Sequence, residues 1–123
     1  MGNTILCVDD EQHGLMIRQM LLERVGYSVL TAASAREGLE LFSCRPVDAV
    51  VLDYYLPDLD GGLVATAMRL IKPDVPIIMF SVQWGLPDET GTVADAVLGK
   101  GQHPISLLNT LEHVLRMRRQ QSA

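Results

Sequence analysis

Several side chains suited to metal and phosphoryl chemistry stand within two positions of the ends of apolar segments of the sequence. They are Asp9 and Asp10 after Thr4–Val8, Asp53 after Val47–Leu52, Ser81 after Val75–Phe80, and Lys100 after Ala96–Leu98. Carboxylates brought together repel one another and raise one another's pKa unless a cation is present. Because Mg²⁺ prefers oxygen ligands of this kind, the cluster of Asp9, Asp10 and Asp53 predicts a magnesium site.

The same residues suit phosphoryl transfer. A carboxylate held near phosphorus can act as a nucleophile and form an aspartyl phosphate, which is the role that we expect for Asp53. The ammonium group of Lys100 and the hydroxyl group of Ser81 are donors of the kind that stabilise phosphoryl oxygens. Any one of these residues alone is more often a solvated loop group or a helix cap, so the prediction rests on their combination.

The elements that must bring these side chains together alternate along the chain. Apolar segments rich in Val, Ile and Leu predict strands buried on both faces, and the amphipathic segments between them predict helices. The expected strands are Thr4–Val8, Ser28–Ala32, Val47–Leu52, Val75–Phe80 and Ala96–Leu98. This alternation favours an α/β fold with a doubly wound parallel sheet and helices on both faces. Ligands of such sheets bind at the carboxyl ends of the strands.

Apolar residues three to five positions apart indicate which face of each helix is buried. The expected buried faces are Leu15, Met16, Met20, Leu21 and Val25 in the first helix, Ala35, Leu39 and Phe42 in the second, Val64, Ala67, Met68 and Ile71 in the third, and Ile105, Leu108, Leu111 and Leu115 in a last helix from about Pro104 to Arg118. Gly26 ends the first helix and Ser34 caps the second. Both Cys7 and Cys44 are expected to be buried thiols.

The composition narrows the possible functions. With 123 residues, of which 48% are hydrophobic and 20% charged, the chain has the size of one domain, 1–123, and enough apolar material for a core. Its net charge of −5 argues against direct nucleic-acid binding. No apolar run reaches the length of about 18 residues that a membrane span requires. We therefore expect a cytoplasmic protein that binds neither nucleic acid nor a membrane.

Taken together, the motifs resemble the receiver domain of bacterial two-component response regulators. They are Val8-Asp9-Asp10-Glu11, Leu52-Asp53, Leu56-Pro57, Asp60-Gly61-Gly62, Phe80-Ser81, and Ala94-Asp95 ahead of Lys100, in that order over essentially the whole chain. The resemblance implies a flavodoxin-like sheet with strand order 2-1-3-4-5. It also implies a signalling module and not an enzyme. Such a module takes a phosphoryl group from the phosphohistidine of a sensor histidine kinase or a histidine phosphotransfer protein, and then changes conformation to signal.

The resemblance also implies a role for each residue of the site. Asp53 is the phosphoacceptor. The groups that contact the phosphoryl oxygens are the side chains of Ser81 and Lys100 and the backbone N–H groups of Tyr55 and Val82. The implied ligands of Mg²⁺ are Asp10, Asp53 and the backbone carbonyl group of Tyr55, with Asp9 acting through water.

Three features differ from the usual pattern of that family. Gly101 follows Lys100 where a proline is usual, and Val97 stands where an aromatic residue usually takes part in switching. The segment QWGLPDETGT, residues 83–92, contains few good helix formers. The fourth helix is therefore expected to be short, shifted or disordered, and Trp84 within it is expected to pack under the loop, to cover the site or to anchor a partner.

Two other functions stay open on the sequence alone. A haloacid-dehalogenase-type phosphatase also forms an aspartyl phosphate, but it needs a second aspartate two positions after the nucleophile, where this chain has Tyr55. A receiver-like protein-binding module that no longer uses phosphate is the other alternative. The residues do not identify the kinase or the output partner. We expect either a stand-alone receiver or part of a longer protein, and a homodimer through the last helix and fifth strand is a further expectation.

Overall fold

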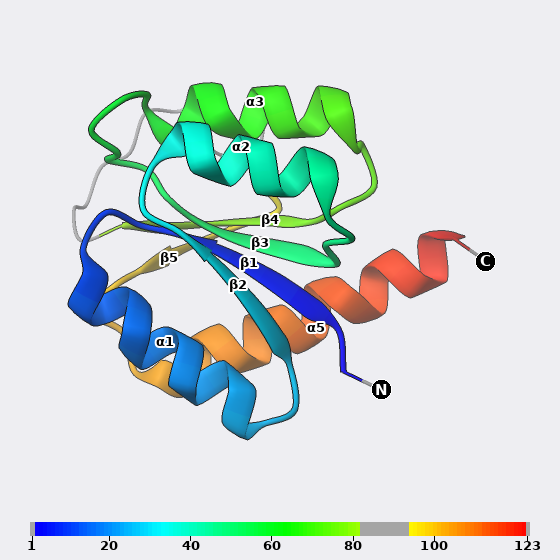
Figure 1. Ribbon diagram of the computed structural model, residues 1–123. Coiled ribbons are helices and arrows are strands. Elements are labelled where there is room, and N and C mark those ends of the chain that lie inside the picture. Colours follow the sequence, from blue (N-terminus) through cyan, green and yellow to red (C-terminus); the bar gives the residue numbers. More distant parts are fainter. Residues whose placement is uncertain (1, 82–93, 123) are drawn as a thin grey trace.

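The computed structural model describes residues 2–81 and 94–122. Its strands form one parallel sheet in the order β2-β1-β3-β4-β5 (Figure 1). The strands are β1 (Thr4–Val8), β2 (Ser28–Ala32), β3 (Ala49–Asp53), β4 (Ile77–Ser81) and β5 (Ala96–Gly99). The helices are α1 (Gln12–Arg24), α2 (Ala35–Cys44), α3 (Gly61–Ile71) and α5 (Pro104–Ser122). The predicted fold and strand order are confirmed, although β3 and β4 each begin two residues later than expected and α5 extends beyond Arg118.

Helices cover both faces of the sheet. Figure 1 shows α2 and α3 on one face and α1 and α5 on the other. Successive residues of β1 point to opposite faces, so Leu6 and Val8 pack in the core beneath α2 and α3, whereas Ile5 and Cys7 pack in the core beneath α1 and α5. Every residue of β3 and β4 is buried. Burial on both faces explains why these strands appear in the sequence as continuous apolar runs.

The buried face of α1 differs from the predicted one. Met16, Met20 and Val25 are each more than half exposed, and the buried apolar residues of the helix are Leu15 and Leu22. Apolar residues surround most of this helix, so their periodicity does not select one face. The face that is turned inward also carries a charged residue, Arg18, whose side chain is 12% exposed.

The other helices follow their predicted faces more closely. In α2, Ala35 and Phe42 are buried as expected, and in α3, Val64 and Met68 are buried. Two expected core residues were wrong, because Ile71 and Ile105 lie at helix ends and are 45% and 50% exposed. Leu107 and Val114 occupy the core beneath α5 together with the predicted Leu111 and Leu115.

The starts of α1, α2 and α3 are each held by a side-chain cap. The Oγ atom of Ser34 accepts a hydrogen bond from the Glu37 N–H group, which confirms the predicted cap of α2. Asp60 accepts from the Leu63 N–H group at the start of α3, and Glu11 accepts from two N–H groups of α1. After α1, Gly26 adopts a φ of 104°, which a side chain would strain, so its predicted role as a helix stop is confirmed.

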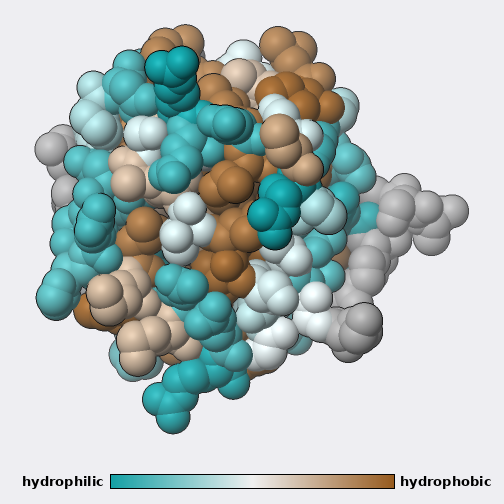
Figure 2. All heavy atoms as spheres, in the orientation of Figure 1, coloured by the Kyte–Doolittle hydropathy of each residue, from teal (hydrophilic) through white to brown (hydrophobic). Residues whose placement is uncertain are grey.

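Some apolar groups remain at the surface. Leu63 and Leu70 of α3 are 59% and 81% exposed, and Figure 2 shows brown apolar atoms at the upper edge of the molecule, where α3 lies in Figure 1. Cys7 is buried as expected, but Cys44 is exposed because it ends α2. Within the described part of the chain, no helix is long and apolar enough to cross a membrane.

Candidate functional site

The carboxyl ends of the four strands β1, β3, β4 and β5 meet at one edge of the sheet. The register pairs Val8 with Leu52, Asp53 with Phe80, and Ser81 with Gly99. Asp9 therefore leaves β1 beside Asp53, and Lys100 leaves β5 beside Ser81. Asp9, Asp53 and Ser81 are buried, although each is polar. Buried polar groups need partners. Because three of them gather at this edge of the sheet, the edge is the candidate functional site.

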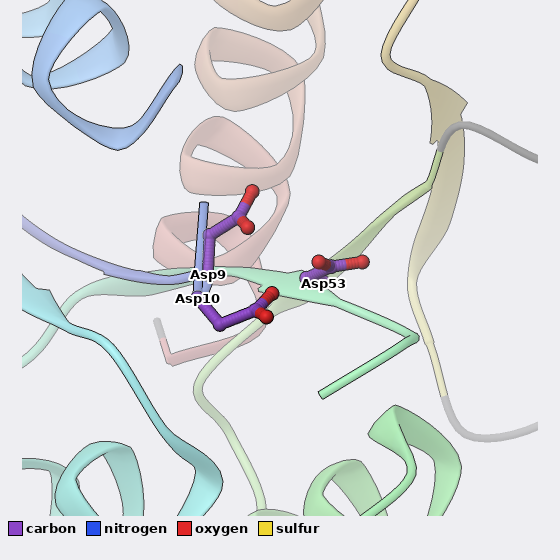
Figure 3. Close-up of side chains that lie close together, drawn as sticks. All are labelled: Asp9, Asp10 and Asp53. Atoms are coloured by element: carbon purple, nitrogen blue, oxygen red, sulfur yellow. The ribbon is translucent and has the colours of Figure 1, made fainter. Parts of the chain in front are cut away.

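Three carboxylates gather at the ends of β1 and β3 (Figure 3). Asp9, Asp10 and Asp53 each offer an oxygen atom within 4.8 Å of the others. Asp10 is exposed, and its carboxylate has no hydrogen-bond or ion-pair partner among residues 2–81 and 94–122. The sequence prediction that these three residues form one cluster is confirmed, and the cluster has the oxygen donors that a divalent cation needs.

Lys100 joins two of these carboxylates. Its Nζ atom lies 2.5 Å from Oδ2 of Asp9 and 3.2 Å from Oδ2 of Asp53. The Lys100 N–H group also donates to the carbonyl oxygen of Ser81 over 2.7 Å, which continues the pairing of β5 with β4. Gly101 follows the lysine without a cis peptide bond, of which the described residues contain none. The glycine therefore does not prevent Lys100 from reaching the site.

The two buried carboxyl groups have opposite pKa shifts. Burial alone would raise the pKa of Asp9, but hydrogen bonds from Lys100 and from the Glu11 N–H group outweigh it, as do the charges of Lys100 and Arg18, and the net pKa is lowered. Burial raises the pKa of Asp53. The charge of Lys100 opposes this rise and the charge of Asp9 adds to it, and the net pKa is above its ordinary value. Asp9 is thus held as an anion, while Asp53 is the carboxylate less well compensated by its surroundings.

The loop after β3 holds the Asp53 carboxylate in place. The Tyr55 N–H group donates to Oδ1 of Asp53 over 3.1 Å, so each oxygen of Asp53 has a donor. Tyr55 pairs with Asp60 in an isolated bridge, and its ring lies edge-on to that of Tyr54 with centroids 4.8 Å apart. The Tyr55 side chain is 43% exposed. The loop thus folds back on itself within a few residues of Asp53.

One residue of the site was not expected from the sequence. Arg18 of α1 pairs with Oδ2 of Asp9 over 2.5 Å, and its guanidinium lies 4.9 Å from the centre of the Phe80 ring. The ion pair lies on the same face of α1 as the buried residues Leu15 and Leu22. The sequence carries a partial signal, because Arg18 follows Leu15 by three positions and precedes Leu22 by four, but it can be used only when that face of α1 is known to be buried. A cation at that spacing within a buried apolar face points to an acidic partner.

Comparison with known proteins identifies the family. Residues 5–103 match the family described as the response regulator receiver domain. The chain belongs to this family. Receiver domains are signalling modules of two-component systems, in which a phosphorelay ends on an aspartate, and they typically bind Mg²⁺ at an acidic cluster. The acidic cluster of this receiver is formed by Asp9, Asp10 and Asp53.

The receiver is similar to transcriptional regulators and to other receivers of known structure. It is 40% identical over 83 residues to the alkaline phosphatase synthesis transcriptional regulatory protein PhoP of Bacillus subtilis, covering 68% of this chain and 35% of that protein. A CheY-like receiver domain protein of Methanospirillum hungatei has a TM-score of 0.92 at 27% identity, over 98% of this chain and 99% of that chain. The response regulator TrrA of Thermotoga maritima, solved in complex with Mg²⁺-BeF, has a TM-score of 0.87 at 28% identity, over 91% and 98% of the two chains.

The receiver spans only part of its curated relatives. It covers 35% of the length of PhoP and 47% of the SrrA regulator of Staphylococcus aureus. The activities of those whole proteins therefore do not pass to this chain directly. Val82, whose N–H group was expected to contact phosphate, lies outside the described residues, as do Trp84 and the predicted fourth helix.

Proposed function

We propose that this receiver accepts a phosphoryl group on Asp53 from the phosphohistidine of a sensor histidine kinase or a histidine phosphotransfer protein. The observation that carries the proposal is the position of Lys100, whose Nζ atom bridges Asp9 and Asp53 at the edge where Ser81 also ends its strand. A nucleophilic carboxylate, a mobile cation and a hydroxyl donor are the groups that phosphoryl transfer to an aspartate needs.

In the proposed reaction, a carboxylate oxygen of Asp53 forms a bond to phosphorus while the bond between phosphorus and the imidazole nitrogen breaks. The electron pair of that bond leaves with the imidazole. Lys100 already lies 3.2 Å from Asp53, so it is placed to follow the new negative charge onto the phosphoryl oxygens. Ser81 and the backbone N–H groups of Tyr55 and Val82 are the further proposed donors. For the Tyr55 N–H group, this role requires that its present bond to Asp53 be exchanged.

The acidic cluster fits Mg²⁺. Its carboxylate oxygens lie within 4.8 Å of one another, and that of Asp10 is exposed. We propose Asp10, Asp53 and the Tyr55 carbonyl group as ligands, with Asp9 acting through water. When bound, Mg²⁺ supplies positive charge that offsets repulsion between the carboxylates and phosphoryl oxygens. Support comes from TrrA of Thermotoga maritima, which was solved in complex with Mg²⁺-BeF.

We further propose that residues 1–123 act as one receiver domain whose output goes through a protein partner or an attached effector domain. Val97 of β5 and Ile105 of α5 are 46% and 50% exposed. These exposed apolar residues of β5 and α5 are the proposed contacts for an output partner or for a second copy of the chain. Direct nucleic-acid binding is not part of the proposal, because the net charge is −5.

The test of the phosphoacceptor uses acetyl phosphate and Mg²⁺, followed by mass spectrometry. We expect one phosphoryl group on the wild type and none on Asp53→Asn. The matched control is Asp74→Asn, because Asp74 lies just before β4, at the opposite end of the strand from the site. The control should be modified like the wild type. Modification of Asp53→Asn to the wild-type level would refute the assignment.

The test of the metal ligands uses Mg²⁺ alone, followed by amide chemical shifts. We expect Asp10→Ala to lose at least about tenfold in affinity, because the site then offers one carboxylate fewer. Asp74→Asn again serves as the control. An unchanged affinity in Asp10→Ala would show that the metal is held elsewhere.

A further inference from the structure

Arg18 is the charged residue on the buried face of α1. Its side chain is 12% exposed and packs against the ring of Phe80. The Nε atom is buried and has no hydrogen-bond partner within the described part of the chain. A guanidinium group loses much hydration at such a position, and it is found there when an acidic partner compensates for the loss. Its pairing with Asp9 is therefore a buried ion pair of the site and not a surface contact.

Two cations meet on one oxygen atom of Asp9. Oδ2 lies 2.5 Å from Nη2 of Arg18 and 2.5 Å from Nζ of Lys100, while Oδ1 accepts from the Glu11 N–H group over 2.9 Å. The two cations differ in their other partners. Lys100 also contacts Asp53, whereas the hydrogen bond of Arg18 within the described residues goes to Asp9.

This difference matters when a phosphoryl group adds negative charge at Asp53. A phosphoryl group there attracts Lys100, which is the cation that already touches Asp53. Movement of Lys100 away from Asp9 would leave a carboxylate that is 1% exposed without that partner. An unpaired buried charge is strongly unfavourable, so without a second cation Lys100 would be held back by Asp9.

We propose that Arg18 is a positioning residue that keeps Asp9 paired and so frees Lys100 to bind the phosphoryl group. The inference rests on the proposed function, because it requires Lys100 to move toward modified Asp53.

Arg18 has a second effect, on the binding of Mg²⁺, before Asp53 is modified. The three carboxylates face two cations, and removal of one cation makes the cluster more negative. Arg18 therefore weakens Mg²⁺ binding by the unmodified protein and strengthens binding of a phosphoryl-like anion.

The experiment compares four proteins with two probes. The proteins are the wild type, Arg18→Met, Arg18→Lys and the control Arg24→Met, which removes an exposed arginine from the same helix. The first probe is Mg²⁺ alone, followed by amide chemical shifts. The second is beryllium fluoride, a phosphoryl analogue, titrated at saturating Mg²⁺. Thermal denaturation of each variant first establishes that it is folded.

The two affinities of Arg18→Met should change in opposite directions. We expect Mg²⁺ to bind roughly threefold to tenfold more tightly and beryllium fluoride to bind about tenfold more weakly, because a nearby positive charge acts oppositely on a cation and an anion. Arg18→Lys retains the charge and should restore most of both affinities. Arg24→Met should behave like the wild type.

The outcomes distinguish a failure of this inference from a failure of the proposed function. Unchanged affinities in Arg18→Met, or a loss of both, would overturn the role of Arg18, since general damage to the site weakens both probes. If Arg18→Met does not fold, wild-type behaviour of a folded Arg18→Ala would overturn the inference in the same way. Failure of the wild type to bind beryllium fluoride, or equal binding by Asp53→Asn, would instead overturn the proposed function.

Discussion

The N–H group of Gly61 donates to the carbonyl oxygen of Tyr54 over 2.6 Å, which seats the first turn of α3 against the end of the strand that carries Asp53. A Cβ atom at position 61 would lie 2.6 Å from the Tyr54 Cα atom and 2.8 Å from the Asp53 carbonyl oxygen. Both neighbours are backbone atoms and cannot turn away. The requirement for glycine here is therefore one of close approach and not of backbone dihedral angles.

We predict that Gly61→Ala lowers the free energy of unfolding by about 1–3 kcal/mol, the usual cost of an overpacked site. It should also slow phosphorylation by acetyl phosphate, because the strand end must shift. Urea denaturation and mass spectrometry measure the two effects.

The matched control is Gly62→Ala, one residue further along the same helix. A Cβ atom there would lie 3.3 Å from Oδ1 of Asp60 and 3.6 Å from Cε2 of Tyr54, both of which belong to side chains that can move. Alanine favours a helix over glycine by up to about 1 kcal/mol, so this variant should be at least as stable as the wild type. Equal unfolding free energies for the two variants would contradict the packing argument.

Asp58 ties the loop after β3 to a helix distant in sequence. Its two carboxylate oxygens accept the N–H groups of Ala35 and Arg36, each over 3.0 Å, at the start of α2. Hydrogen bonds from these two N–H groups lower the pKa of the exposed Asp58 carboxyl below its ordinary value of 3.8. The loop that carries Tyr55 is therefore held by two sets of contacts, the bridge between Tyr55 and Asp60 and the hydrogen bonds of Asp58 to α2.

We predict that Asp58→Asn is less stable than the wild type at neutral pH and that the difference narrows as the pH falls below 3.8. Because the folded-state pKa is lowered, the stability contributed by Asp58 is present above 3.8 and is lost as the pH falls through the folded-state pKa. Urea denaturation at about pH 7 and about pH 3 measures the change. Glu40→Gln alters an exposed carboxylate of α2 and should show no such dependence. A difference between wild type and Asp58→Asn that persists unchanged in acid would contradict the ionic cap.

The two cysteines are expected to differ sharply in reactivity. Cys7 is 1% exposed, and burial raises the pKa of its thiol to about 12, whereas Cys44 is exposed at the end of α2. The thiolate is the reactive form, so a disulfide reagent at about pH 8 should label Cys44 quickly and Cys7 only when the sheet opens. Cys44→Ser should abolish the fast phase and leave labelling in urea intact. A fast phase that survives in Cys44→Ser would show that β1 is accessible.

The residues that form the acidic cluster could be predicted because their positions depend on strand ends. Apolar runs mark where β1 and β3 end, parallel pairing brings those ends together, and Asp9, Asp10 and Asp53 follow at once. The same reasoning placed Ser81 and Lys100 at this edge. None of these steps depends on a side-chain conformation. The pattern of apolar runs in the sequence was therefore sufficient to predict the cluster.

Arg18 could not be predicted in the same way, because its position depends on which face of α1 turns inward. Periodicity favoured Met16 and Met20, which are exposed. The pairing of Arg18 with Asp9 exists only after β1 and α1 have packed together, so the apolar pattern of α1 does not reveal it. The exposure of Cys44 has a simpler origin, since Cys44 is the last residue of α2 and lies outside the buried face formed by Ala35, Gly38 and Phe42.

The last prediction concerns the lifetime of the phosphoryl group on Asp53. The backbone of Tyr55 is fixed next to this carboxylate by the 3.1 Å bond from its N–H group to Oδ1, and the loop is closed by pairing with Asp60. The ring packs edge-on against Tyr54 and remains 43% exposed, so it lies at the surface and not in the core. Hydrolysis requires water to approach phosphorus in line with the departing Asp53 oxygen, and we expect a bulky ring two residues from Asp53 to obstruct that approach.

We therefore predict that Tyr55→Ala loses its phosphoryl group about tenfold faster than the wild type, which corresponds to about 1.4 kcal/mol of activation free energy. Tyr55→Phe keeps the ring without its hydroxyl group and should match the wild type if bulk is the cause. Phosphate release is measured from each protein after labelling with acetyl phosphate, at equal Mg²⁺. A fast Tyr55→Phe would assign the effect to the hydroxyl group, whereas equal rates for wild type and Tyr55→Ala would mean that the ring points away from phosphorus. Gln83, whose amide was expected to orient a water molecule, lies outside the described residues, so the prediction depends on Tyr55 alone.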